Sequence, residues 1–273
     1  MDRALAKGEN PDSPGFANGA DREWFRTTFG AEYLRLYRHR DAAEGEAQAH
    51  FAREVTPIAA SARVLDLACG AGRHARVLAR DARVIGLDRS RGLLDEGRRA
   101  SASTPAAERP RWVEGDMRHL PFARAGFDVV VTFFSSLGYF STEEENRATR
   151  REISRTLKPG GRFFIDLMDR QWVIDRLVPQ SERSDGTLSI RERRWITEGG
   201  ERVEKETVVV DGSRERRYQE SVRLYDIDDI RDRFAEVGLE VERTYGDFSG
   251  VPHRAGETPR MILTGVRTEV GSK

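Results

Sequence analysis

A short apolar run that ends in a glycine-rich turn and continues as a helix constrains this chain most. Val64–Leu67 is followed by Ala68-Cys69-Gly70-Ala71-Gly72, and apolar residues then recur at helical spacing. This order predicts a strand, a tight turn and a helix. Glycine at 70 and 72 lets a ligand approach the backbone, and the free N–H groups at the start of the helix favour an electron-rich group. The stretch therefore indicates a nucleotide-like ligand.

Two classes of ligand fit this turn. Residues 70–75 match the loose glycine pattern of dinucleotide folds, and Asp88, after the apolar run 84–87, is placed to accept from ribose hydroxyls. Asp66, however, lies inside the strand, where a dinucleotide fold usually carries an apolar residue. A carboxylate there suits an ammonium or sulfonium group better than a pyrophosphate. A nicotinamide-dependent oxidoreductase and a non-catalytic cofactor-binding module are the alternatives.

Five motifs then follow one another in register along the chain. They are Leu65–Gly72, Gly86-Leu87-Asp88, Glu114-Gly115-Asp116-Met117, Phe127–Val131 and Leu157–Ile165. Together they resemble the class I S-adenosylmethionine-dependent methyltransferases, which implies S-adenosylmethionine as the cofactor. The resemblance assigns the methionine portion of the cofactor to Asp66 and the Ala68–Gly72 backbone. It assigns the ribose to Asp88, and the adenine to Asp116 and Met117.

Further cofactor contacts are expected on either side of these motifs. N-terminal helices often close over the cofactor in the resembled family, which implies a catalytic role for Tyr33 and a cofactor contact for Tyr37. The alternative for these tyrosines is an ordinary packed face. His74 follows the glycine turn and is expected to contact the cofactor carboxylate. Phe133 follows the fourth strand, where the methyl group should point.

The loop after the fourth strand bears on the acceptor. It lacks the Asn/Asp-Pro-Pro-Tyr/Phe tetrapeptide of many methyltransferases of DNA bases and protein amides. Its Phe-Ser-Ser-Leu-Gly-Tyr-Phe at 134–140 resembles the loop of small-molecule methyltransferases. We therefore expect a small-molecule acceptor, with transfer to nitrogen ahead of oxygen or carbon. Tyr139 is expected to orient this acceptor or to contact the cofactor, or else to pack in the wall of the site.

A general base is needed only if the acceptor arrives protonated. His253, in an irregular stretch before the last strand, is the best candidate for this role. The alternative is an exposed loop histidine. Groups of His, Cys and Asp with metal-ligand spacing are not seen in the sequence, so we expect no metal.

The pattern from residue 60 onward predicts an α/β fold. Apolar strands at 64–67, 84–87, 112–114, 129–132 and 163–166 alternate with helices near 73–80, 91–100 and 143–157. Such alternation implies a parallel sheet covered by helices on both faces. A helix at 227–237 and strands at 239–245 and 260–266 follow. In the resembled family the last two strands form an antiparallel pair, which gives a Rossmann-like, mostly parallel sheet of seven strands.

The alternation stops after residue 168. Three successive strands at 189–197, 202–210 and 214–225, separated by glycine turns, predict an antiparallel β insertion after the fifth strand. The insertion either roofs the acceptor pocket or forms a dimer surface, and both roles remain open. We expect a mobile segment at 1–21, a cofactor-binding domain at 22–179 and 225–268, and the insertion at 180–224.

Charge and cysteine content bear on partners and location. Lys+Arg and Asp+Glu both number 46, and the zero net charge argues against a nucleic-acid partner held by general electrostatics. The single cysteine, Cys69, cannot form an internal disulfide, and residues 1–10 lack an apolar segment. We therefore expect a cytoplasmic protein without a membrane partner. Its expected partner is a small-molecule substrate, with a homodimer as one option.

Overall fold

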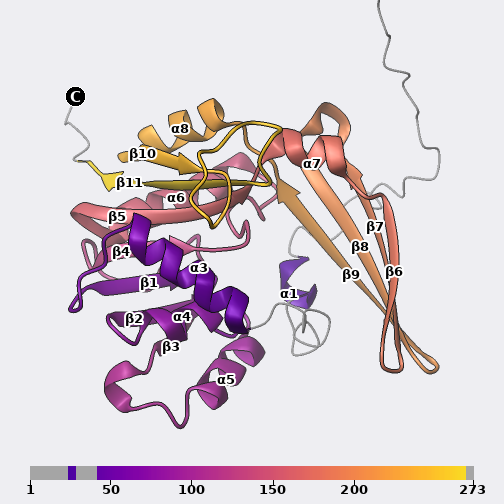
Figure 1. The fold of residues 1–273 in the computed structure, drawn as a ribbon, viewed down its shortest axis with the longest axis horizontal. Helices are drawn as coiled ribbons and strands as arrows, with labels where there is room; N and C mark the ends of the chain where they lie inside the picture. Colours follow the sequence, from indigo (N-terminus) through magenta and orange to yellow (C-terminus); the bar gives the residue numbers. More distant parts are fainter. Residues whose placement is uncertain (1–23, 29–41, 269–273) are drawn as a thin grey trace, which may run out of the picture.

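The computed structural model describes residues 24–28 and 42–268 of the 273-residue chain. Figure 1 shows a central sheet with helices on both sides and a second sheet of long strands standing at one end of it. The predicted mobile segment 1–21 and the residues Tyr33 and Tyr37 lie outside the described residues.

The central sheet has seven strands in the order β10-β11-β5-β4-β1-β2-β3. Its strands are β1 (Arg63–Leu67), β2 (Arg83–Asp88), β3 (Arg111–Glu114), β4 (Phe127–Thr132), β5 (Leu157–Met168), β10 (Leu239–Tyr245) and β11 (Arg260–Arg267). Strand β1 pairs in parallel with β2 and β4, whereas β11 runs antiparallel to β5 and β10. The predicted fold class, a Rossmann-like and mostly parallel sheet with an antiparallel insertion, is confirmed.

Helices cover both faces of this sheet because successive strand residues point to opposite sides. The helices are α1 (Phe25–Thr28), α3 (Ala42–Val55), α4 (Arg73–Leu78), α5 (Arg91–Ala100), α6 (Glu143–Thr156), α7 (Arg170–Arg176) and α8 (Ile227–Ala235), with short 3₁₀ turns at Ala106–Glu108 and Glu198–Gly200. Val64 belongs to the core under α3 and α4, whereas Leu65 belongs to the core under α6 and α8. The parallel strands are therefore apolar on both faces.

The second sheet follows α7 and has the order β6-β7-β8-β9, with antiparallel pairing throughout. Its strands are β6 (Gln180–Asp185), β7 (Leu188–Ile196), β8 (Arg202–Asp211) and β9 (Arg214–Arg223). The prediction of three strands is wrong, because β6 was missed. Its sequence Gln-Ser-Glu-Arg-Ser-Asp contains no apolar residue and therefore shows no hydrophobic pattern. A strand at the edge of a sheet can have this composition because most of its side chains are exposed.

The root of the second sheet is anchored to the loop that follows β4. The guanidinium of Arg202 on β8 donates to the carbonyl oxygens of Gly138 (3.2 Å) and Phe140 (3.1 Å). Helix α1, near the start of the chain, also contacts the second sheet. The Thr28 hydroxyl donates to the carbonyl oxygen of Gln219 on β9 at 2.8 Å. The insertion therefore stands beside the edge of the central sheet at which the parallel strands end.

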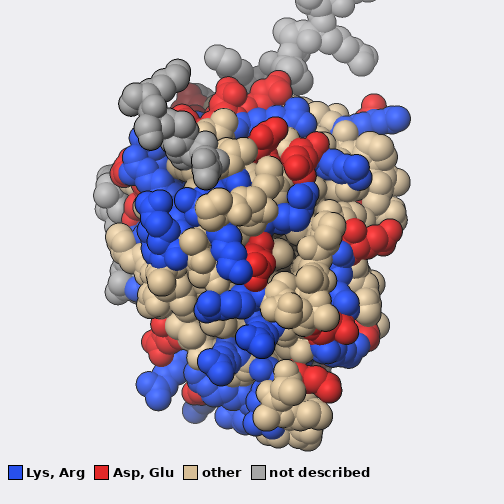
Figure 2. Space-filling model, turned by 90° about the vertical axis from the view of Figure 1, so that its left-hand side faces the viewer, with Lys and Arg blue, Asp and Glu red and all other residues tan. Residues whose placement is uncertain are grey.

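The molecular surface carries charges of both signs. On the face shown in Figure 2, Lys and Arg side chains are interspersed with Asp and Glu and with uncharged residues. This mixture agrees with the equal totals of 46 basic and 46 acidic residues. Among the helices of the described ranges, none has the length and apolar character required to cross a membrane.

Candidate cofactor and acceptor site

The turn between β1 and α4 has an unusual backbone conformation. Ala68, Gly70 and Gly72 adopt positive φ angles of 59°, 57° and 68°. A Cβ atom built on Gly70 would meet only the Leu93 side chain within 4 Å, at 3.9 Å. The backbone of the turn is therefore open to a ligand at Gly70, next to the N-terminus of α4.

Gly72 also makes room for the packing of a neighbouring aromatic ring. A Cβ atom on Gly72 would lie 2.1 Å from the ring of Trp112, and Cβ atoms on Gly86 and Gly97 would lie 2.9 and 3.1 Å from the same ring. Three glycines thus make room for one indole beneath the turn. Packing against Trp112 thus requires glycine at position 72, and the cofactor contact expected of Gly72 stays a prediction.

Asp66 is buried in β1 with only 1% of its surface exposed. Its Oδ2 has no hydrogen-bond partner, while the backbone of Ala75 in α4 donates to the carboxyl group. Burial, followed by the charge of Asp88, raises the pKa of Asp66 to about 8. A buried carboxyl group with an unused acceptor oxygen fits a ligand that brings an ammonium group.

Asp88 ties the glycine turn to the end of β2. Its Oδ2 accepts from the Gly70 N–H and its Oδ1 accepts from the Ser90 N–H, both at 2.8 Å. Burial raises the pKa of this carboxyl group, against the hydrogen bonds from the backbone. Each carboxylate oxygen has a second lone pair. The group can therefore accept from two neighbouring hydroxyls while it holds the turn in place.

Asp116, at the end of β3, lies in a chain of ion pairs. Arg89 donates to its Oδ2 at 2.7 Å, and Arg118 donates to both of its oxygens while also pairing with Glu145. Burial opposes ionisation here, but the hydrogen bonds from Arg118 hold the pKa of Asp116 below its usual value. The arginines thus occupy the carboxylate that the resemblance assigns to adenine.

An aromatic cluster lies beside this ion-pair chain. Trp24, Phe25 and Phe140 are buried together, with Met117 and Tyr139 packed against them. The rings of Trp24 and Tyr139 meet edge to face with their centroids 5.2 Å apart. Helix α1 is therefore held over the residues that follow β3 and β4, where the resemblance places the adenine and the methyl group.

The loop after β4 is held in a strained conformation by a buried ion pair. Phe134 and Ser135 have positive φ angles of 59° and 57°, which are unfavourable for residues other than glycine. Asp166, fully buried in β5, accepts from the Phe134 N–H at 2.8 Å and from Arg260 Nε at 2.7 Å, and Arg260 Nη2 donates to the Ser135 hydroxyl at 3.2 Å. The sequence reasoning missed this pair. Its signal was an acid within an apolar strand, as at Asp66.

His74 and Phe133 lie together in the core between α3 and β4. The two rings stack with centroids 3.9 Å apart, and His74 Nε2 lies 2.9 Å from the Gln48 side-chain oxygen. Burial, assisted by the charge of Arg73, lowers the pKa of His74 well below its usual value. The imidazole is therefore neutral and packed, with 4% of its surface exposed.

His253 forms a buried pair with Asp169. Its Nε2 lies 2.8 Å from Asp169 Oδ2, and both side chains are 5% exposed. The other oxygen of Asp169 accepts from the backbone N–H groups of Trp172 and Gly256 at 2.7 and 2.9 Å. Asp169 directly follows β5, three residues after Asp166. The alternative of an exposed loop histidine is therefore wrong.

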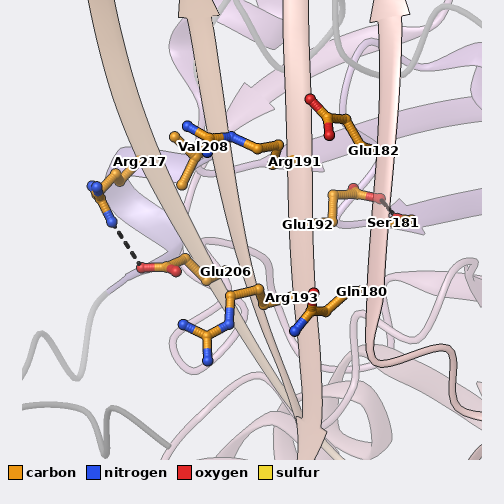
Figure 3. A pocket seen from close by; sticks show the side chains of 9 residues that line it. All are labelled: Gln180, Ser181, Glu182, Arg191, Glu192, Arg193, Glu206, Val208 and Arg217. Atoms are coloured by element: carbon orange, nitrogen blue, oxygen red, sulfur yellow. Dashed lines mark hydrogen bonds and ion pairs between the residues drawn. The ribbon is translucent and has the colours of Figure 1, made fainter. Parts of the chain in front are cut away.

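A separate cavity of about 410 Å³ lies on the insertion (Figure 3). It is lined by Gln180, Ser181, Glu182, Arg191, Glu192, Arg193, Glu206, Val208 and Arg217. All of these residues come from β6 to β9, and the Arg217 and Glu206 side chains pair within it at 3.6 Å. This cavity is therefore distinct from the cofactor edge of the central sheet. In the described ranges, no group of three or more His, Cys, Asp or Glu side chains is placed to hold a metal ion.

Comparison with known proteins shows the family of this chain. Residues 64–161 match the model of the methyltransferase domain. A dTDP-3-amino-3,4,6-trideoxy-alpha-D-glucopyranose N,N-dimethyltransferase from Streptomyces venezuelae is 30% identical over 220 residues, which cover 77% of this chain and 87% of that protein. The cypemycin N-terminal methyltransferase of a Streptomyces species is 29% identical over 214 residues, 73% of this chain and 81% of that protein. The CcbJ methyltransferase from Streptomyces caelestis has a TM-score of 0.75 at 21% identity, covering 88% of this chain and 98% of its own.

The chain belongs to the class I S-adenosylmethionine-dependent methyltransferases. The cofactor is therefore S-adenosylmethionine, as predicted, and the site is chemically suited to it. Gly70 presents open backbone, Asp66 has a buried acceptor oxygen to spare, and Asp88 can receive a diol. The alternatives of a nicotinamide-dependent oxidoreductase and of a non-catalytic binding module are set aside.

Proposed function

We propose that this enzyme methylates an amine nitrogen of a small molecule. The observation that carries the proposal is the length over which this chain aligns with two N-methyltransferases. The family model matches only residues 64–161, whereas the two Streptomyces N-methyltransferases align over 214 and 220 residues. Alignments of that length extend well beyond the family match, and this extent supports an acceptor chemistry shared with these relatives. One of these relatives acts on an amino sugar nucleotide and the other on a peptide N-terminus, by their names.

The proposed cofactor residues act by holding and orienting. S-adenosylmethionine supplies a methyl group that its sulfonium already activates, so the protein mainly has to align donor and acceptor and exclude water. In this proposal the Ala68–Gly72 backbone and Asp66 hold the methionine portion, and Asp88 holds the ribose. Met117 packs against the adenine. Asp116 acts there through Arg118, because that arginine engages both of its oxygens.

The acceptor side of the proposal rests on Tyr139 and on the Asp169–His253 pair. A primary or secondary amine is largely protonated at neutral pH and has no lone pair for the attack until it loses a proton. With Nε2–H donating to the Asp169 carboxylate, the Nδ1 atom of His253 carries a lone pair that can accept this proton. Tyr139, in the loop after β4, orients the amine in this proposal. The described residues do not include Tyr33 and Tyr37, whose roles stay predictions.

Paired acceptors test this function directly. The enzyme is incubated with methyl-deuterated S-adenosylmethionine and with amino compounds, each matched by the hydroxy compound that has the same skeleton. Amino sugar nucleotides and short peptides are included, and products are read by mass spectrometry. We expect the deuterated methyl group only on the amines. Labelling of the hydroxy partner without labelling of the amine would refute transfer to nitrogen.

A further inference from the structure

The bend formed by Phe134 and Ser135, in the loop after β4, is enclosed by contacts from two other strands. Asp166 on β5 accepts both N–H groups of the bend, that of Phe134 with Oδ2 at 2.8 Å and that of Ser135 with its backbone carbonyl at 2.9 Å. The other carboxylate oxygen, Oδ1, accepts from Arg260 Nε at 2.7 Å and from Nη2 at 2.6 Å. Arg260 Nη2 also donates to the Ser135 hydroxyl at 3.2 Å. The Arg260 guanidinium, at the start of β11, therefore closes a ring of contacts around the bend.

The bend depends on these contacts for its conformation. Phe134 and Ser135 both have positive φ angles, which residues with a Cβ atom disfavour. Gly138, in the same loop, adopts a φ angle of 106° without this cost. A buried carboxylate is a stable support only while its charge is paired, and Asp166 is fully buried. The conformation of the bend therefore relies on Arg260.

Arg260 also adjoins the segment that carries His253. The carbonyl oxygen of Pro259, the preceding residue, accepts from the Asp169 N–H at 3.2 Å. Asp169 Oδ2 in turn lies 2.8 Å from His253 Nε2. Because Asp166 and Asp169 lie three residues apart at the end of β5, the first residue of β11 stands between the loop after β4 and the His253 segment.

A second arginine acts on the same bend from the glycine turn. The guanidinium carbon of Arg73, at the start of α4, lies 4.3 Å from the centroid of the Phe134 ring. Burial raises the pKa of Asp166, whereas the charge of Arg260, and more weakly that of Arg73, opposes this rise. Two arginines from different elements therefore favour the charged carboxylate that holds the bend.

We propose that Arg260 is a positioning residue for methyl transfer, and that it fixes the loop after β4 and the His253 segment relative to each other. The inference rests on the proposed function, in which Tyr139 and His253 act on the acceptor. Attack on the sulfonium methyl requires the acceptor nitrogen to lie in line with it, and small displacements lower the rate strongly. Loss of the Arg260 contacts should therefore reduce kcat without reducing cofactor affinity.

Arg260→Lys tests this role, because lysine keeps the positive charge beside Asp166 and removes the planar fork. With an amine identified by the paired acceptors, we expect kcat to fall about 30-fold. The affinity for S-adenosylhomocysteine, measured by calorimetric titration, should stay the same. Arg267→Lys, at the last position of β11, is the matched control, because Arg267 donates to the carbonyl of Leu157 at the opposite end of β5. An equal kcat in the two variants would overturn the proposal.

Ser135→Ala removes one contact of Arg260 and keeps the ion pair, so it tests the proposal even if Arg260→Lys does not fold. We expect kcat to fall about threefold. In the double variant with Arg260→Lys, kcat should be no lower than in Arg260→Lys alone, because both changes remove the same contact. Fully additive losses would show that Arg260 does not act through Ser135 and would contradict the proposal.

A fluorine signal reports the position of the loop without any acceptor. The chain has four tryptophans, and the ring of Trp24 lies against Tyr139 with centroids 5.2 Å apart. In protein labelled with 5-fluorotryptophan, the Trp24 resonance should shift in Arg260→Lys and in Ser135→Ala, whereas that of Trp112 beneath the glycine turn should not. Absence of any methylated amine would refute the proposed function and leave this readout intact. An unmoved Trp24 resonance in both variants would instead refute the positioning role.

Discussion

Asp66 has an environment that gives the unliganded protein a specific pH dependence. Its pKa is about 8 in the folded state, against 3.8 for an exposed carboxyl group. Between these values the folded state holds a proton that the unfolded state has lost, so stability falls as pH rises. The loss is about 1.4 kcal/mol per pH unit, and it ends above the folded pKa. Asp66→Asn cannot ionise and should therefore become more stable than the natural protein as pH increases.

Urea unfolding of the unliganded proteins from about pH 3 to about pH 9 measures this difference. The two proteins should be equally dependent on pH below the unfolded pKa and diverge up to about pH 8. Asp95→Asn, at a position on α5 with 45% of its side chain exposed, is the matched control and should run parallel to the natural protein. Parallel curves for Asp66→Asn as well would show that Asp66 is ionised in the fold.

The proposed role of His253 predicts a change in kcat. If it accepts the proton of the acceptor amine, His253→Asn should lower kcat about 100-fold and leave the affinity for S-adenosylhomocysteine unchanged. Labelled-product formation under saturating cofactor, together with calorimetric titration, separates the two quantities. Arg254→Gln, at the adjacent and exposed position, is the control. If His253→Asn retained its kcat, His253 would not be the general base, and its pairing with Asp169 would only support the loop that contains it.

The residues that the sequence could predict lie within single motifs. Asp66 and Asp88 flank one glycine turn, and their types alone indicated a cationic group and a diol. Pairings between distant positions carry no such signal. Arg260 is 94 residues from Asp166, and His253 is 84 residues from Asp169, so nothing in either local sequence names the partner. The packing role of Gly72 has no local signal for the same reason, because the ring that it accommodates belongs to Trp112 on another strand.

At the level of elements, the short helix α1 connects the cofactor side of the site to the insertion. Phe25 packs on Phe140 with ring centroids 5.5 Å apart, and the guanidinium groups of Arg89 and Arg118 lie over its ring at 5.3 and 5.9 Å. These arginines also hold Asp116. The helix is therefore fixed to the residues that we propose to lie beside the adenine.

Phe25→Ala should release α1 and weaken S-adenosylhomocysteine binding about tenfold, since a buried aromatic pair of this kind contributes about 1 kcal/mol beyond the area that it buries. Calorimetric titration measures the affinity, and urea unfolding checks that the central sheet remains stable. Val178→Ala, at an apolar position that is 58% exposed, is the control and should change neither quantity. An unchanged affinity for Phe25→Ala would place α1 outside the cofactor site.

Elements were predictable where hydrophobic periodicity was strong. The central parallel strands β1 and β4 are apolar on both faces, and the last three strands of the insertion contain alternating apolar residues such as Ile190 and Val209. Strand β6 has neither pattern. Backbone pairing with β7 from Gln180 to Asp185 creates it, and such pairing depends on the neighbouring strand rather than on side-chain type. An exposed edge strand is thus the element that local sequence describes least.

At the level of the whole molecule, the central sheet and the second sheet meet at the edge at which the parallel strands end. The parallel strands place Asp66, Asp88 and Asp166 at the ends at which the glycine turn and the loop after β4 begin. The second sheet is attached at that edge through Arg202. We propose that the central sheet binds the cofactor, while the insertion roofs the acceptor pocket and folds as a separate unit.

Excision of the insertion separates these two tasks. Residues 181–222 are replaced by eight Gly and Ser residues, a flexible linker with an end-to-end distance of about 15 Å. Because each cofactor residue proposed among the described residues lies outside the excised range, the variant should still bind S-adenosylhomocysteine by calorimetry. It should no longer transfer the deuterated methyl group to the amine, since the loop after β4 loses the support of Arg202 and the acceptor loses its cover. Failure of the variant to fold, or loss of S-adenosylhomocysteine binding, would mean that the two sheets form one cooperative unit. Retained methyl transfer would instead assign the insertion to contacts between copies of the chain.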